Sequence, residues 1–241
     1  MIEVTVALPL YKAKDIAWLC LESFCNQVDV GFAWELIVIE EQEAVRAYEK
    51  RLKKAGCKNI KYIPLTEWMP LGQKWKVMAD FADENSKCYI WSAADLYSEP
   101  KRFKKTYQYI NVEGYDWVCD RMCPFYDITS GKTILYADRE CQQRAGLSAS
   151  TRMEVMKRLP DNNYAKKVDG LIVKAVRPKT FKNIFDGENE DWKYGFNTDG
   201  MNLISLNRAK YYHNVKWPFE KTDLDLRDYI PKNVIDKLFK L

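Results

Sequence analysis

Asp95 is the residue of this sequence best placed to hold a divalent metal ion. It follows a short apolar run, residues 88–91, and three small residues, Ser92, Ala93 and Ala94. An apolar run of this length between turn signals predicts a buried strand, and open α/β sheets bind ligands at the carboxyl ends of their strands. The small residues let a bulky anion approach the backbone, and a carboxylate beside them can hold a metal that grips phosphates. The alternative is that Asp95 caps the helix that follows.

Length and composition indicate one large globular domain, or one domain with a small appendage, with a mild positive charge. The chain has 241 residues, of which 47% are hydrophobic, and a formal net charge of +4. This excess allows an anionic partner such as a nucleotide or nucleic acid without requiring one. No apolar run reaches the roughly 18 residues that span a bilayer, and the amino-terminal segment lacks the basic start of a signal peptide.

The cysteine and histidine content points to reduced thiols and argues against a zinc site. The seven cysteines are an odd number and lie mostly in apolar segments, and the chain has a single histidine, His213. This pattern is typical of a cytoplasm-like compartment, so we expect a cytoplasmic protein. Cys119 and Cys123 are close in sequence, but one histidine is too few to complete a zinc site with them.

Hydrophobic periodicity predicts alternating strands and helices in the first hundred residues. The expected strands are residues 4–8, 34–40, 60–63 and 88–91. The expected helices are residues 15–26, 42–54 and 73–84. This alternation predicts an α/β fold with a parallel, doubly wound sheet. The sequence contains neither the G-x-G-x-x-G dinucleotide fingerprint nor a P-loop, so other groups must bind any nucleotide.

The second half of the chain is less regular. Its expected elements are strands at residues 116–119, 121–129 and 133–137, a helix at 147–159 and a C-terminal amphipathic helix within 224–241. Residues 185–202 are rich in Gly, Asn, Asp and aromatics, which is typical of a loop. Asp169 opens an apolar segment, where an acid is usually a helix cap.

Four segments together resemble the family 2-type glycosyltransferases of GT-A fold. They are LPLY at residues 8–11, LESFCNQ at 21–27, WELIVIEE at 34–41 and IWSAADLYSEPKR at 90–102. The resemblance covers most of residues 1–180. It implies a GT-A-like, Rossmann-like α/β fold with a mostly parallel central sheet flanked by helices and a smaller acceptor-side sheet. The family's Asp-x-Asp motif is incomplete, because Ala93 stands where the first acid is expected.

The resemblance also implies how the chain is divided. It predicts a single domain over residues 1–241, with a nucleotide-sugar-binding half at 1–105, an acceptor-binding half at 106–215 and a C-terminal helical tail at 216–241. The implied donor-binding residues are Pro9, Leu10, Tyr11, Glu40, Gly72, Lys74, Lys76, Ala93, Ala94 and Asp95. The alternative for Glu40 and the two lysines is a solvated charge at the start of a helix.

The catalytic and metal-binding residues are likewise implied by the resemblance. Asp95 would bind Mn²⁺ or Mg²⁺, which neutralises the leaving diphosphate. His213 would complete the metal site, as a late histidine does in some relatives. Asp169 would act as the general base that takes the proton of the acceptor hydroxyl, with Asp120 and Asp138 as the other candidates.

The resulting hypothesis is an inverting glycosyltransferase that uses a nucleotide-diphosphate-sugar, with a UDP-sugar as the leading donor. The acceptor is either a glycan or a hydroxymethylated base in DNA, as for virus-encoded enzymes that modify DNA. The DNA alternative depends on basic clusters at residues 101–105, 152–158 and 166–167, which are more often solvated helix faces. A catalytically decayed nucleotide- or glycan-binding module is a second hypothesis, and a nucleotidyltransferase is a third.

Overall fold

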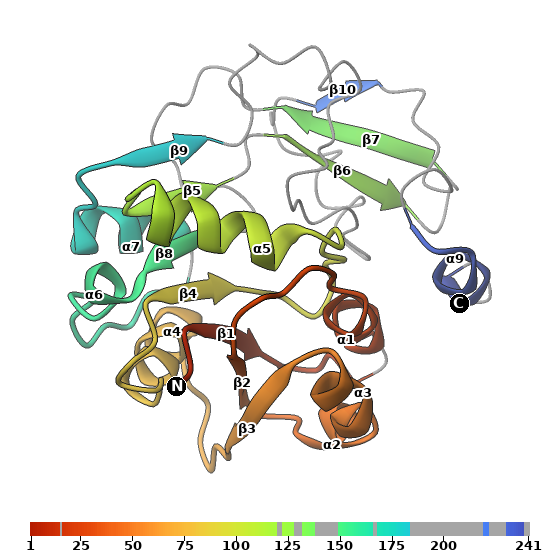
Figure 1. Ribbon diagram of the computed structural model, residues 1–241, viewed down its shortest axis with the longest axis horizontal. Coiled ribbons are helices and arrows are strands. Elements are labelled where there is room, and N and C mark those ends of the chain that lie inside the picture. Colours follow the sequence, from red (N-terminus) through yellow and green to blue (C-terminus); the bar gives the residue numbers. More distant parts are fainter. Residues whose placement is uncertain are drawn as a thin grey trace.

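A seven-stranded sheet with the order β3-β2-β1-β4-β8-β5-β9 forms the centre of the protein (Figure 1). Its strands are β1 (Val4–Pro9), β2 (Trp34–Ile39), β3 (Cys57–Ile63), β4 (Cys88–Trp91), β5 (Trp117–Cys119), β8 (Ser150–Arg152) and β9 (Phe181–Asn183). The computed structural model describes residues 1–14, 16–119, 122–127, 132–137, 149–165, 168–183, 219–221 and 230–238. The expected α/β fold with a mostly parallel central sheet is confirmed.

The first four strands of the chain are parallel, with β1, β2 and β4 inside the sheet and β3 at its edge. β1 pairs with β2, Val4 opposite Trp34, and on its other side with β4, Val4 opposite Cys88. Every residue of β2 and β4 is buried. Apolar runs without alternation are what parallel strands covered on both faces require, which is why the sequence predicted these strands well.

Helices cover both faces of the sheet. They are α1 (Trp18–Cys25), α2 (Glu43–Arg46), α3 (Glu49–Lys54), α4 (Leu71–Asp80), α5 (Arg102–Tyr107), α6 (Met153–Met156), α7 (Val168–Val176) and α9 (Lys232–Leu238), with a π-helical turn, η1 (Gln108–Val112), after α5. Two apolar cores result, because successive residues of a strand point to opposite faces. Val6 and Leu8 of β1 contribute to the core under α1, α3 and α5. Ala7 contributes to the core under α4, α6 and α7.

Three tryptophans lie in contact within the second core. The rings of Trp75 and Trp91 are stacked with centroids 4.9 Å apart, and Trp91 meets Trp117 edge-on at 5.3 Å. Such offset and edge-to-face pairs add to the free energy of burial. The hydroxyl of Tyr89 donates to the Trp75 carbonyl at 3.1 Å, so α4 is fixed to β4 by both packing and a hydrogen bond.

The expected helix at residues 147–159 is wrong. β8 occupies the middle of this segment, and only the short α6 follows it. In β8, Thr151 lies opposite Tyr89 of β4 and Trp117 of β5 in antiparallel pairs. These pairs join residues far apart in the chain, and packing against neighbouring strands overrides the helical spacing of the apolar residues.

The expected helix at residues 42–54 is divided into α2 and α3. The backbone N–H of Tyr48 donates to the carbonyl of Val45 at 2.8 Å, three residues earlier rather than four. The tighter turn ends α2, and the Tyr48 hydroxyl then donates to Oε1 of Glu22 on α1 at 3.2 Å. The break therefore allows α3 to pack against α1.

A second, smaller sheet is antiparallel, with the order β10-β7-β6. It contains β6 (Met122–Asp127), β7 (Lys132–Ala137) and β10 (Phe219–Lys221). β6 and β7 confirm the strands expected at 121–129 and 133–137. Pro124 is tolerated in β6 because this strand forms an edge of the sheet and needs fewer ladder hydrogen bonds.

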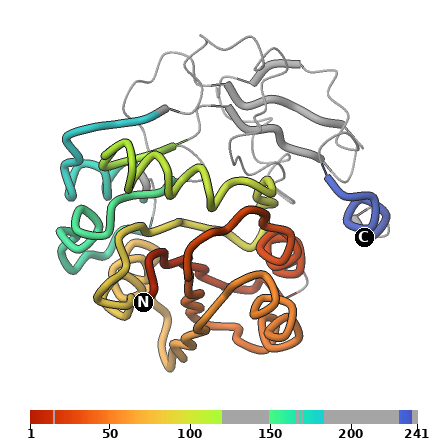
Figure 2. The backbone as a smooth tube through the Cα atoms, viewed as in Figure 1, coloured from red at the N-terminus to blue at the C-terminus, as the bar shows by residue number. Residues whose placement is uncertain are grey.

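The C-terminal helix α9, blue in Figure 2, reaches α1, the first helix of the chain, through one side chain. The Nζ atom of Lys237 lies 4.0 Å from the ring centroid of Trp18, a cation–π contact. Nearby, two hydrogen bonds of 2.6 Å from Arg51 hold the pKa of the Glu22 carboxyl below its usual value. A helix after Pro231 is thus confirmed, and its Lys237 side chain contacts Trp18 of α1.

Free thiols and short helices characterise the described part of the chain. Cys20, Cys25, Cys57 and Cys88 have free thiols, and burial raises the pKa of the Cys57 thiol to about 12. None of the described helices is long and apolar enough to cross a membrane.

Candidate functional site

The loops that follow β1, β2 and β4 meet at one edge of the sheet. The N–H of Leu10 donates to the last carbonyl of β2 at 3.0 Å, and the N–H of Ser92 donates to the Ala7 carbonyl at 3.0 Å. The N–H of Ala13 donates to Oε2 of Glu41 at 2.6 Å, which ties the first loop to the second. Parallel strands place their carboxyl ends together, and this edge is where α/β sheets bind ligands.

Two residues of these loops hold a left-handed backbone. Lys12, after β1, has φ = 52°, and Glu40, after β2, has φ = 68°. Such angles are uncommon for residues other than glycine and concentrate at functional sites. The N–H of Glu40 donates to the Ile63 carbonyl at 3.2 Å, so the end of β3 fixes the backbone from which this carboxylate projects.

Tyr11, Lys74 and Glu40 form one cluster at the carboxyl edge. The ring of Tyr11 is exposed by 53%, with the Nζ of Lys74 5.1 Å and the Nζ of Lys12 5.3 Å from its centroid. Lys74 is only 4% exposed and forms an ion pair with Glu40. Lysine is almost never buried without a partner. The sequence predicted these three residues for one site, and the structure brings them together.

Pro9 and Leu10 contribute differently from Tyr11. Pro9 is partly exposed, whereas Leu10 is fully buried among the core residues under α1. The side chain of Leu10 thus belongs to the core, and its backbone is the part that lies at the edge.

The Asp95 loop, residues 92–98, is held at both ends by a single buried side chain. Arg102, which is 1% exposed, donates from Nη2 to the Trp91 carbonyl at 2.7 Å. Its Nη1 donates to the hydroxyl of Ser98, also at 2.7 Å. A guanidinium can bridge two acceptors in this way because its donors form a rigid fork. Asp95 therefore projects, partly exposed, from a loop whose two ends are fixed.

The three small residues before Asp95 have different surroundings. Ser92 is buried, Ala93 is partly exposed and Ala94 packs in the same core as Cys20 of α1. Burial and the charge of Asp95 raise the pKa of the Cys20 thiol. The thiol is therefore protonated at neutral pH, and Asp95 lies close enough to α1 to act on it.

The end of α1 also braces the Asp95 loop and the helix after it. Asn26 donates from Nδ2 to the hydroxyl of Tyr97 at 3.2 Å. Gln27 donates from Nε2 to the Glu99 carbonyl at 2.9 Å and accepts the N–H of Phe103 at 3.0 Å. One glutamine side chain thus satisfies backbone groups before and within α5, including an orphan donor of its first turn.

Gly72 and Lys76, both predicted to bind donor, have partners within the protein. The N–H of Gly72 donates to the Tyr164 carbonyl at 2.9 Å. A Cβ atom on Gly72 would lie 2.3 Å from Oδ1 of Asn162 and 2.7 Å from Cβ of Tyr164. Lys76 pairs with Asp80 one turn along α4, with Nζ 2.6 Å from Oδ1. Glycine is required at position 72 because the segment around Asn162 packs directly on α4.

Replacing Gly72 with Ala is expected to lower the free energy of unfolding by about 1–3 kcal/mol, the cost of overpacking a filled site. At this chain length that corresponds to a fall in Tm of roughly 2–10 °C. Gly31→Ala is the matched control, since a Cβ there meets nothing within 4 Å. Thermal denaturation of both variants provides the measurement. Equal Tm values for the two would contradict the close contact at Gly72.

The remaining predicted site residues have side chains outside the described part of the structure. Asp169 is the second residue of α7, which packs on the second core through Val168 and Ile172. The side chain of Asp169 lies outside the described residues, as do His213, Asp120, Asp138 and residues 185–202.

One carboxylate fits a metal ion that arrives with a phosphate ligand. Within the described ranges, no group of three Asp, Glu, His or Cys side chains could hold a metal on its own. Mg²⁺ sites, however, commonly use one or two carboxylates together with substrate phosphates and water. Asp95, partly exposed in a loop of small residues, fits that second kind of site.

Three contributors to this edge were missed by sequence reasoning. Arg102 and Gln27 hold the Asp95 loop, and Lys12 lies beside the Tyr11 ring. Arg102 looks like one basic residue in a lysine-rich stretch, and only its burial reveals its role. Gln27 lies in the segment LESFCNQ, so the resemblance contained a signal that could have identified it.

Comparison with known proteins gives structural matches but no sequence match. No protein-family model and no curated protein sequence matches the chain. The crystal structure of S. aureus TarS matches over 88% of this chain and 38% of its own, with a TM-score of 0.59 and 12% identity. TarS 1–349 in complex with UDP-GlcNAc matches over 86% of this chain and 59% of its own, with a TM-score of 0.60 and 14% identity.

A second enzyme matches to a similar degree. The mannosyltransferase PcManGT from Pyrobaculum calidifontis, in complex with GDP-Man and Mn²⁺, matches over 90% of this chain and 66% of its own, with a TM-score of 0.55 and 12% identity. By length, the present chain covers about two fifths of TarS and about two thirds of PcManGT. Together with the sheet order and the loops at its carboxyl edge, these matches establish that the chain has the GT-A fold of nucleotide-sugar glycosyltransferases.

Proposed function

We propose that this protein is a glycosyltransferase that moves a sugar from a nucleotide-diphosphate-sugar to a hydroxyl acceptor with inversion. One observation carries the proposal: the loops after β1, β2 and β4 gather Tyr11, the Glu40–Lys74 pair and Asp95 at one edge of a GT-A sheet. An aromatic face, paired charges and a carboxylate suit a nucleotide linked to phosphates. The solved complexes of TarS with UDP-GlcNAc and of PcManGT with GDP-Man support the substrate class.

In the proposed donor site, the exposed ring of Tyr11 contacts the base, and Glu40 accepts hydrogen bonds from the base or ribose. Its ion pair with Lys74 holds the carboxylate in place, and its oxygens act as acceptors. Lys12 also adds a positive charge beside the Tyr11 ring, which favours the diphosphate. A UDP-sugar is the proposed donor, in a single domain whose first 105 residues form the donor half.

Asp95 is proposed to hold the metal and diphosphate side of the donor. A bound Mn²⁺ or Mg²⁺ would neutralise the negative charge that develops on the leaving diphosphate. Arg102 fixes the ends of the loop, and Asp95 is the residue that would hold the metal. Preorganised charges of this kind cost no reorganisation at the moment of reaction.

The acceptor half is proposed to supply one general base and the acceptor site. Asp169, near the start of α7, takes the proton of the attacking hydroxyl in this proposal. A glycan is the proposed acceptor and the cytoplasm the proposed location. The second candidate is a binding module without turnover, which the incomplete motif favours, since Ala93 provides no second acid.

The decisive experiment is a donor panel. Purified protein is incubated with UDP-, GDP-, dTDP- and CMP-sugars, with and without Mn²⁺, and both Tm and donor hydrolysis are recorded. A donor present at 100 times its Kd stabilises the fold by about 2.7 kcal/mol, which raises Tm by roughly 5–10 °C at this size. A shift with one nucleotide accompanied by hydrolysis supports the transferase, and a shift without hydrolysis supports the binding module. If no donor shifts Tm, the transferase is excluded, and a glycan-binding module is the hypothesis that is left.

A further inference from the structure

The side chain of Asn162 closes a turn in the segment between α6 and α7. The N–H of Tyr164 donates to Oδ1 of Asn162 at 3.2 Å, and Nδ2 of Asn162 donates to the Pro160 carbonyl at 3.0 Å. Asparagine commonly forms such bonds with the backbone two residues along the chain, and they define a turn. The amide of Asn162 thus fixes the conformation of this segment from within.

The same segment binds the first turn of α4. The N–H of Gly72 donates to the Tyr164 carbonyl at 2.9 Å, and the Gly72 carbonyl accepts from Nδ2 of Asn162 at 3.3 Å. The N–H of Asn162 donates to Oε1 of Gln73 at 2.9 Å. The first N–H groups of a helix have no partner inside it, and Pro70, the residue before α4, has no side chain that could cap them. The segment around Asn162 takes the place of a cap.

This contact lies two residues from the donor cluster. The N–H of Lys74 donates to the Pro70 carbonyl at 3.1 Å, so Lys74 belongs to the same first turn as Gly72. Its side chain is 4% exposed, is paired with Glu40 and has its Nζ 5.1 Å from the centroid of the Tyr11 ring. Because protein interiors are close-packed, a buried ammonium has little room to compensate for a shift of its backbone. The position of the start of α4 therefore decides where this ammonium lies.

We propose that Asn162 is a positioning residue for the donor site. Through Gly72 and Gln73 it sets the start of α4, and with it the Glu40–Lys74 pair. Asn162 acts through α4 and not by a contact with the donor. This inference rests on the proposed function, because the cluster that Asn162 positions is the proposed donor site.

Amine labelling tests the positioning without any ligand. The folded protein is acetylated with acetic anhydride, and the rate at Lys74 is measured by peptide mass spectrometry relative to Lys54, an exposed lysine of α3. We expect Lys74 to react about fivefold faster in Asn162→Ala than in the wild type, the effect of one lost hydrogen bond. Asn162→Asp keeps the oxygen that accepts from Tyr164 but loses the Nδ2 donor, so its rate should be intermediate.

Binding of UDP in the presence of Mn²⁺ tests the consequence for the donor. Calorimetric titrations are made at a temperature below the Tm of every variant. We expect about a fivefold loss of affinity in Asn162→Ala and a smaller loss in Asn162→Asp, in the same order as the labelling rates. A residue with a structural role alone would lower Tm and leave the UDP affinity of the folded protein unchanged.

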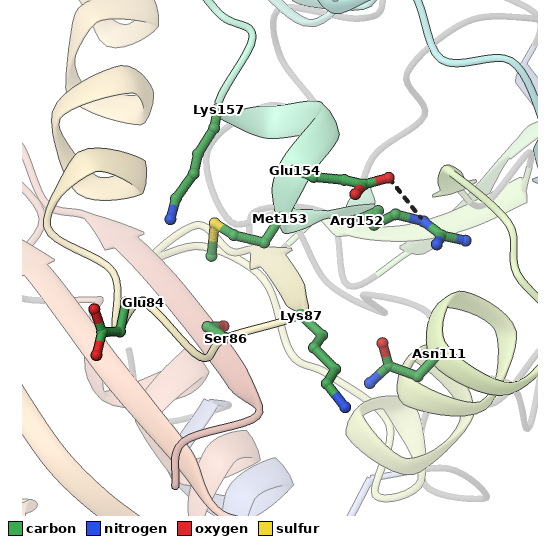
Figure 3. A pocket seen from close by; sticks show the side chains of 8 residues that line it. All are labelled: Glu84, Ser86, Lys87, Asn111, Arg152, Met153, Glu154 and Lys157. Carbon is green, nitrogen blue, oxygen red and sulfur yellow. Dashed lines mark ion pairs between the residues drawn. The ribbon is translucent and has the colours of Figure 1, made fainter.

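Asn85→Ala is the matched control. Asn85 also forms a hydrogen bond through its side chain, from Nδ2 to Oδ1 of Asp83 at 3.1 Å. It lies between Glu84 and Ser86, which line a pocket of about 330 Å³ at the amino end of β4 (Figure 3). The donor cluster lies at the carboxyl edge of the sheet, so both the Lys74 labelling rate and the UDP affinity of this variant should match those of the wild type.

Three results would overturn the inference. Equal labelling rates of Lys74 in the wild type and Asn162→Ala would show that Asn162 does not position this lysine. Faster labelling with unchanged UDP affinity would show that the position of Lys74 does not matter to the donor. If the wild type itself does not bind UDP, the proposed UDP-sugar donor fails together with the role of Asn162 in its site. That failure is distinguishable, because the labelling rates are measured without UDP.

Discussion

Replacing Asp95 with Asn is expected to reduce sugar transfer by about 10²–10³-fold, the usual effect of removing one preorganised electrostatic contact. Asn has nearly the same shape as Asp but no charge, so it cannot hold a metal against the diphosphate in the same way. The loop should keep its structure, because Arg102 clamps it through the Trp91 carbonyl and the Ser98 hydroxyl. We therefore expect a variant that folds but has lost most of its activity.

Two measurements on Asp95→Asn separate its proposed role from a structural one. Initial rates of donor hydrolysis should fall, and the Mn²⁺-dependent part of the donor-induced rise in Tm should disappear. The control is Glu43→Gln on α2, whose carboxylate is 89% exposed. Its rates should match those of the wild type. Asp95→Asn with full activity and an unchanged response to Mn²⁺ would refute the assignment.

Replacing Arg102 with Met is expected to lower the free energy of unfolding by about 2–4 kcal/mol. Methionine fills similar volume, but the Trp91 carbonyl and Ser98 hydroxyl lose their charged donor, and each buried unsatisfied group costs about 1–3 kcal/mol. A fall in Tm of roughly 5–15 °C follows for a chain of this length. Donor affinity should fall as well, because Asp95 would then project from a loop without a clamp.

Urea denaturation and donor titration of Arg102→Met check this expectation, with Arg102→Lys as a graded comparison. Lysine restores the charge but not the fork that bridges two acceptors, so both stability and affinity should lie between those of the wild type and Arg102→Met. Arg46→Met on α2 serves as the exposed control, with an expected change within about 0.5 kcal/mol. If donor affinity survives in Arg102→Met below its Tm, the clamp is structural only.

The parallel half of the fold was predictable because its signals are local. Apolar runs such as residues 34–39 are what buried parallel strands require. In the helices between these strands, apolar residues recur at the spacing of one helical face. The segment at residues 147–159 was not predictable in this way. Its strand β8 exists because Thr151 finds partners in β4 and β5, and no short window of sequence contains that pairing.

In the candidate site, too, the positions set by local signals were predictable and the contacts between distant segments were not. Tyr11, Glu40 and Asp95 follow predicted strands, so the topology alone places them at one edge. What sequence could not supply is how they are held. The partner of Lys74 is Glu40, which lies more than 30 residues earlier in the chain. The burial of Arg102 depends on how the Asp95 loop packs around it. The paired state of Lys74 also shows that a predicted phosphate ligand can have a partner inside the protein.

The three touching tryptophans of the second core have a spectroscopic consequence. Trp91 is stacked on Trp75 and meets Trp117 edge-on, so light absorbed by one indole is shared among all three. Trp75 directly follows Lys74 in the chain, and the carbonyl of Trp91 is bound by Arg102. The three tryptophans are thereby connected to Lys74, the partner of Glu40, and to Arg102, which holds the Asp95 loop. Near-ultraviolet circular dichroism and intrinsic emission can follow events at this edge without any attached label.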